Sequence, residues 1–229
     1  MSFSGFKTKM IVTGLAATLA TSAFGYWRYA EYRQQELRNE ITELVKDTSM
    51  RLGDALDART APTSTEKLQV LRRFYEDAET VDGHYRRLSS LNIAPIGELA
   101  DAADDYVLTS REILLRRASS HRNRLKLSGS IRALRNHMRA DNRTGFWVTE
   151  AVRAKDRVEE DYRDYKRTVD ALAKLLESFP HSRAKMAPHV DAALLTDEAL
   201  IEEARQQALE ASRQAADEIA KARQLTAYR

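Results

Sequence analysis

The side chains that could do acid–base or metal chemistry are scattered along this sequence rather than grouped. Its five histidines form no HExxH pattern, and no Glu precedes a His by three residues, so the helical zinc and di-iron signatures are missing. The sequence contains no Cys, which removes thiolate metal sites and redox motifs. Neither a glycine-rich phosphate loop nor a nucleophile elbow occurs in it. We therefore expect no enzymatic activity, no metal and no other cofactor.

Acidic side chains do cluster, but in a pattern that is typical of a solvated helix surface. Each cluster lies in a helix-like segment and has basic residues around it. A general acid would need a carboxyl group held in a cleft at a shifted pKa, and the pattern indicates no such cleft. The clusters are Asp101, Asp104 and Asp105, then Glu159, Glu160 and Asp161, and finally Glu202 and Glu203.

The segment 113–140 has an unusual charge pattern, with eight basic residues and no acid, whereas residues 61–112 hold ten acids and six bases. The pattern predicts a surface for an anionic partner such as lipid headgroups or an acidic protein. Alternatively, the basic residues pair with acids of neighbouring helices. Nucleic acid is a poor fit, because no aromatic residue is interleaved as a stacking platform. The candidate residues are Arg116, Arg117, Arg122, Arg124, Lys126, Arg132, Arg135 and Arg139.

Residues 1–32 have the composition of an N-terminal membrane anchor. The run 10–27 carries no charge and is 18 residues long, which is the short end of what spans a bilayer. Aromatic residues cluster where this run ends, as in an interfacial belt. Two alternatives remain open: a signal peptide cleaved near 21–23, and an apolar helix buried in a soluble core. The candidate anchor residues are Ile11, Val12, Leu15, Leu19, Phe24, Tyr26 and Trp27.

The flanking charges suggest an orientation for this anchor. Lys7 and Lys9 precede the run and favour a cytoplasmic N-terminus, although three arginines follow it. We therefore expect a single-pass inner-membrane protein with most of its chain in the periplasm. A mitochondrial inner-membrane protein and a domain that faces the cytoplasm are the alternatives.

The remaining residues, 33–229, predict one all-α domain. Apolar residues recur at spacings of three and four, glycines and prolines are few, and no strand-like alternation occurs. We expect an elongated antiparallel bundle or coiled coil of four to five helices. The apolar face shifts at Ser128-Gly129-Ser130, so we predict a kink or a short break there. The predicted helices cover residues 33–58, 64–91, 95–127, 130–140, 146–179 and 197–225.

The helix over 146–179 carries the most regular apolar repeat in the chain, which indicates a coiled-coil-like partner helix. We expect it to end at Phe179-Pro180, and we expect Thr196-Asp197 to cap the last helix. The packing seam consists of Val158, Tyr162, Tyr165, Val169, Leu172 and Leu176.

Together these features predict a single-pass, membrane-anchored helical scaffold or an accessory subunit of a membrane complex. It would work through protein–protein contact, with partner subunits of unknown identity and with anionic lipid headgroups as further candidates. One alternative is an extracytoplasmic sensory or ligand-binding bundle. Another is an adaptor that uses the basic segment 113–140 at a membrane surface or on nucleic acid.

Overall fold

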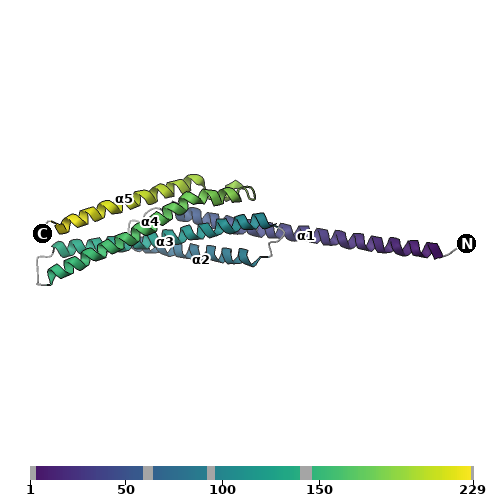
Figure 1. The fold of residues 1–229 in the computed structure, drawn as a ribbon, viewed down its shortest axis with the longest axis horizontal. Coiled ribbons are helices and arrows are strands. Elements are labelled where there is room, and N and C mark those ends of the chain that lie inside the picture. The colour runs from purple at the N-terminus through teal and green to yellow at the C-terminus, as the bar shows by residue number, and fades with distance from the viewer. Residues whose placement is uncertain (1–3, 59–63, 92–95, 140–145, 228–229) are drawn as a thin grey trace.

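The computed structural model describes residues 4–58, 64–91, 96–139 and 146–227, with side chains for residues 27–58, 65–91, 96–139 and 146–224. These residues form five α-helices packed as an all-α bundle, and successive helices run antiparallel (Figure 1). The helices are α1 (Ser4–Asp57), α2 (Ser64–Ser90), α3 (Gly97–Arg139), α4 (Trp147–Met186) and α5 (Glu198–Ala227), with a short 3-10 helix, η2 (Ala192–Leu194). The expected all-α bundle is confirmed.

The longest helix is α1, and only its C-terminal half lies in the bundle (Figure 1). Trp27, Tyr29 and Tyr32 are exposed, and Leu37 is the first residue of α1 in the core. The other predicted anchor residues lie outside the part of the chain whose side chains are described. Where side chains are described, no helix has a stretch long and apolar enough to cross a bilayer.

Of the predicted kink or short break in the middle of α3, the break is wrong, because α3 is one helix across Ser128-Gly129-Ser130. The two apolar faces are both buried because the neighbours of α3 change along its length. The N-terminal half of α3 packs against α1 and α2, and α5 lies beside its C-terminal half (Figure 1). Helix α4 runs alongside both halves. The Ser130 hydroxyl donates a hydrogen bond to Asp161 of α4, at 2.5 Å, where the break was expected.

The predicted end of α4 at Pro180 is also wrong, since α4 continues to Met186 with Pro180 inside it. A proline inside a helix removes one backbone hydrogen bond. Tertiary contacts compensate: Ser182 and Met186 are buried, and Arg183 donates to the Thr196 carbonyl at 2.8 Å. The predicted cap of α5 is confirmed, because the Asp197 carboxylate accepts from the Ala199 amide at 2.9 Å.

The core follows the seam of α4. Five of the six predicted seam residues are buried, and the sixth, Tyr162, is half-buried against them. The first residues of α4 differ, because Phe146, Val148 and Val152 are exposed. The predicted coiled-coil repeat is therefore covered by other helices from Val158 onward.

A buried polar network joins three distant segments in the core. The Tyr106 hydroxyl is 2.8 Å from Ser49 Oγ and 3.0 Å from Thr196 Oγ1, and it accepts from the Thr196 amide at 3.2 Å. The Tyr106 ring also packs against Phe179. Because buried polar groups must be satisfied, this network positions the start of α5 against α1 and α3.

Two regions of the bundle differ in the number of helices that surround their core. The proximal region contains α1 from Leu37 to Ala58, α2, the first half of α3 and the second half of α4. The distal region, beyond the residues that α1 and α2 contact, contains three described helices: α3 after Arg124, α4 before Tyr165, and α5 after Gln214. The C-terminal end of α1 marks the boundary (Figure 1).

Candidate anion-binding groove

Two hollows lie on the bundle beyond the end of α1, and both are lined by residues of α3 and α5. Upstream of this point α1 contacts both helices, as where Gly53 of α1 faces Leu200 of α5. Beyond Ala58, two successive hollows follow the same two helices toward the distal end. The first hollow borders the end of α1 at Ala58, and the second lies further along α3, with Glu218 of α5 at its edge; together they are called the groove.

The first hollow has a volume of about 270 Å³ and lies next to the end of α1. Its apolar wall comes from α2 and α4, including Phe74, Val169 and Leu172, whereas α3 and α5 supply its polar groups. Those polar groups are Arg117, Ser120, His121, Arg124, Tyr165, Gln207 and Gln214, of which Tyr165 belongs to α4. The residues that line this hollow include two arginines and no carboxylate.

Arg117 is the most buried cation of this hollow. Its Nη2 donates to the carbonyls of Leu56 and Ala58, both at 3.1 Å, so it satisfies the free carbonyls at the end of α1. The guanidinium lies 5.6 Å from the centre of the Phe74 ring. Burial lowers the pKa of Arg117 to about 10. Within the described ranges, its buried Nε has no hydrogen-bond partner and the residue forms no ion pair.

The pair of Arg124 and Glu218 separates the two hollows. Arg124 donates to both carboxylate oxygens of Glu218 on α5, at 2.6 and 3.0 Å. Its guanidinium also lies 5.7 Å from the centre of the Tyr165 ring. Burial raises the pKa of the Tyr165 phenol. The charge of Arg124 is therefore matched inside the bundle.

The second hollow, of about 400 Å³, carries a row of arginines. Arg132, Arg135 and Arg139 line it together with Ser128, Ile131, Asn136 and Glu218. Spacings of three and four residues place the three arginines on one face of α3. All three are exposed, and none forms an ion pair with a described residue.

The basic segment 113–140 therefore divides into parts with different surroundings. Arg117 and Arg124 lie inside the bundle, and Arg124 pairs with an acid of a neighbouring helix. The other six candidates, Arg116, Arg122, Lys126, Arg132, Arg135 and Arg139, are exposed. Arg116, Arg122 and Lys126 are exposed at the level of the covered Arg117 and Arg124, whereas Arg132, Arg135 and Arg139 lie beyond the end of α1.

Comparison with known protein families, with curated proteins and with solved structures finds no match to this chain. The groove must accordingly be interpreted from its own residues.

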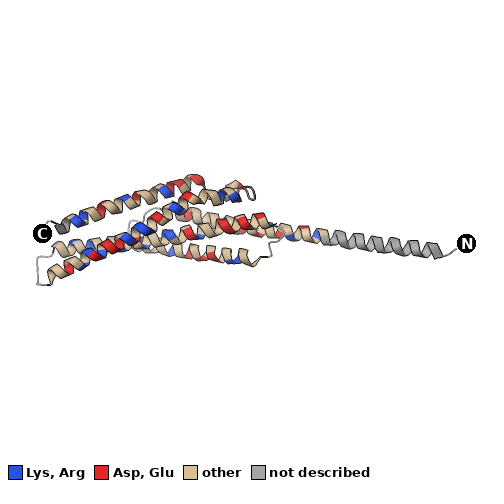
Figure 2. Cartoon of the chain, viewed as in Figure 1, with Lys and Arg blue, Asp and Glu red and all other residues tan. Residues whose placement is uncertain are grey.

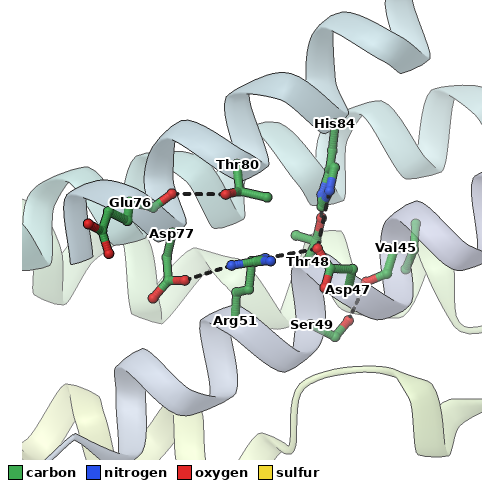
Figure 3. Close-up of polar contacts among 9 residues, drawn as sticks. All are labelled: Val45, Asp47, Thr48, Ser49, Arg51, Glu76, Asp77, Thr80 and His84. Carbon is green, nitrogen blue, oxygen red and sulfur yellow. Dashed lines mark hydrogen bonds and ion pairs between the residues drawn. The ribbon is translucent and has the colours of Figure 1, made fainter. Parts of the chain in front are cut away.

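A second polar cluster joins α1 to α2 in the proximal region (Figure 3). Arg51 donates to Asp47 at 2.8 Å and to Asp77 of α2 at 3.0 Å. His84 of α2 lies 3.0 Å from the Thr48 hydroxyl and 3.2 Å from the Asp47 carboxylate. Burial lowers the pKa of His84; Asp47 acts against this shift and Arg51 adds to it. This arrangement is a closed structural network, since every charged member has a partner inside it.

The other histidines have two kinds of surroundings. His121 contacts the Lys67 carbonyl at 3.0 Å, and burial lowers its pKa. His137 stacks on Trp147 where α3 meets α4. His181 and His189 are exposed. Nowhere in the described ranges do three His, Asp or Glu side chains gather as a metal site would require.

Two of the three acidic clusters take part in contacts between helices, whereas Glu202 and Glu203 bond to residues of their own helix, α5. Glu159 of α4 accepts from Arg223 of α5 at 2.7 and 2.8 Å, and these hydrogen bonds lower its pKa. Asp105 of α3 pairs with Lys185 of α4 at 3.0 Å. Basic and acidic residues are interspersed along the described helices, apart from the acid-free stretch of α3 (Figure 2). The three arginines of the second hollow, like the exposed Arg116, Arg122 and Lys126, have no ion-pair partner among the described residues.

Proposed function

We propose that this chain is a helical scaffold that holds an acidic helix of a partner protein in the distal part of the groove. The observation that carries the proposal is the second hollow, which lies on α3 beyond the end of α1, is bordered by Glu218 of α5, and has Arg132, Arg135 and Arg139 along its wall.

The charge of the wall favours an acidic occupant. Arginine presents several donors in a planar fork that matches a carboxylate, and it is enriched at protein interfaces. A partner helix with Glu or Asp at spacings of three and four residues would face Arg132, Arg135 and Arg139 in register. Ile131 supplies an apolar contact at the base of the same hollow.

We further propose that the scaffold is anchored to a membrane through its N-terminal segment. The support comes from the charge-free run 10–27 and from Trp27, Tyr29 and Tyr32, which are exposed on α1 where an interfacial belt would lie. Because α1 is one helix from Ser4 to Asp57, movement of the anchor would be transmitted directly to the bundle.

Site-specific photocrosslinking in cells of the source organism tests the partner proposal. A photoreactive residue replaces Asn136, which lines the second hollow, in the full chain. We expect one discrete adduct with another protein, and mass spectrometry should map the contact to an acid-rich helix. The triple variant Arg132→Glu, Arg135→Glu, Arg139→Glu should abolish this adduct.

The matched control places the same photoreactive residue at Ala133, which is exposed but does not line the hollow. The proposal fails if position 136 gives no adduct, if position 133 gives the same one, or if the charge reversal leaves it unchanged. An adduct made only with a second copy of this chain would indicate self-association instead.

A further inference from the structure

The first hollow contains a cation that has no counter-charge among the residues that the structure describes. Arg117 is largely buried, and its hydrogen bonds go to two neutral carbonyl groups. The carbonyl end of α1 and the Phe74 ring offset part of the desolvation cost. Buried charges in proteins are nevertheless normally paired with an opposite charge.

The neighbours of Arg117 do not provide that charge. Arg124 is already matched by Glu218. His121 is not an anion in either protonation state, and a positive Arg117 nearby disfavours its charged form. The remaining polar groups, Ser120, Tyr165, Gln207 and Gln214, are neutral, and one amide hydrogen each of Gln207 and Gln214 is donated to Glu203 and Glu210. The wall of the hollow thus carries one net positive charge.

The shape and the other walls define what would complete the site. Phe74, Val169 and Leu172 offer an apolar surface opposite the polar groups. A volume of about 270 Å³ is slightly below the usual range for sites of drug-sized ligands. The occupant is therefore small, carries a single negative charge and has a hydrocarbon body.

We propose that the first hollow binds a small organic carboxylate. Its carboxylate group lies against the Arg117 guanidinium, and its hydrocarbon part lies against Phe74, Val169 and Leu172. Ser120, Gln207 and Gln214 supply hydrogen bonds around the charged end. This site is separate from the partner-binding hollow, because the Arg124–Glu218 pair divides the two.

Titration of the full chain with benzoate and with hexanoate tests this proposal. We expect a saturable rise in melting temperature and saturable heat in calorimetry for at least one of the two. Benzyl alcohol and 1-hexanol, which have similar bodies without the charge, should bind at least about tenfold more weakly. Inorganic phosphate, which lacks the apolar body, should also bind weakly.

Arg117→Met should abolish binding of the carboxylate, whereas Arg116→Met, on the exposed neighbour, should leave it unchanged. The triple charge reversal in the second hollow should also leave it unchanged, so this proposal and the partner proposal can fail independently. If the Arg117→Met variant does not fold, imidazole NMR of the unmodified chain replaces it. Benzoate should then shift the His121 resonances saturably and leave those of His181 and His189 in place.

The proposal is overturned if neither carboxylate binds the unmodified chain at concentrations up to about 10 mM, which corresponds to a free energy of only about −3 kcal/mol. It is also overturned if benzyl alcohol and 1-hexanol bind as well as the carboxylates, or if Arg117→Met binds the carboxylate with full affinity. Arg117 would then serve only to satisfy the carbonyls at the end of α1.

Discussion

The proximal and distal regions use the same residue types but differ in how many helices cover them. In the proximal region α1 closes the bundle, and polar groups such as those of Tyr106, Ser49 and Thr196 satisfy one another inside it. In the distal region α1 is missing, and Arg132, Arg135 and Arg139 stand along an open groove. The comparison teaches that a basic helix face which is covered beside α1 becomes exposed where α1 ends.

The largest difference should appear when core side chains are truncated. Phe179 is completely buried against Tyr106, so Phe179→Ala should lower the free energy of unfolding by about 3–5 kcal/mol. Met138 lies near the distal end and is 8% exposed, so Met138→Ala should cost less than half of that. Denaturant unfolding measures both. Equal losses would show that the distal core is as fully packed as the proximal core.

Removing a single hydroxyl from the proximal network should have the next largest effect. Tyr106→Phe keeps the ring but leaves the Ser49 and Thr196 hydroxyls and the Thr196 amide with fewer partners. We expect a loss of about 1–3 kcal/mol in the free energy of unfolding. Tyr162→Phe, in the same helix bundle but at a half-buried position, serves as the control and should be nearly neutral. A neutral Tyr106→Phe would mean that the network contributes no stability.

The paired and the exposed arginines of α3 should differ in how much their replacement lowers the free energy of unfolding. Arg124→Ala breaks a two-point pair with Glu218 and should cost about 1 kcal/mol of stability. Arg132→Ala removes an exposed side chain without an ion pair to the described residues, and should change stability by less than about 0.5 kcal/mol. A greater loss for Arg132→Ala would contradict the assignment of that residue to an open surface.

The smallest effect concerns pH and involves the buried histidines. Burial lowers the pKa of His84 and of His121 in the folded chain below the ordinary histidine value of 6.5. Just below pH 6.5 the unfolded chain therefore binds more protons than the folded chain. Stability should therefore be complete above pH 6.5 and should fall as the pH decreases through that value toward the lower folded pKa.

Urea unfolding between pH 5.5 and pH 7.5 checks this slope. His84→Gln should flatten it in part, because His121 keeps its own contribution, whereas His181→Gln, at an exposed position, should leave it unchanged. An identical slope for His84→Gln and the unmodified chain would show that His84 titrates alike in both states.

Much of the helical architecture could be predicted from the sequence, because apolar spacing and the Asp197 cap depend on local residues. The two wrong boundaries have a common cause. At Pro180 and at Gly129, local breaking signals were overridden by packing: Met186 is buried beyond the first, and neighbouring helices flank the second.

Of the candidate site, only the basic composition of its helix could be predicted from the sequence. The acid-free basic run on α3 is visible in the sequence, but nothing local distinguishes Arg117 and Arg124 from Arg132 and Arg135. Their difference arises from contacts across long sequence separations, such as those of Arg117 with Leu56 and of Arg124 with Glu218. The pairing of His84 with Asp47 was missed for the same reason.

The central claim is that the end of α1 separates the covered Arg117 from the accessible Arg132, Arg135 and Arg139 on a single helix. Phenylglyoxal modification of the folded full chain, followed residue by residue with mass spectrometry, tests this most directly. We predict that Arg132, Arg135 and Arg139 react fastest, that Arg124 reacts more slowly, and that Arg117 stays protected until the chain is unfolded. Reaction of Arg117 at the same rate as Arg132 would contradict the account.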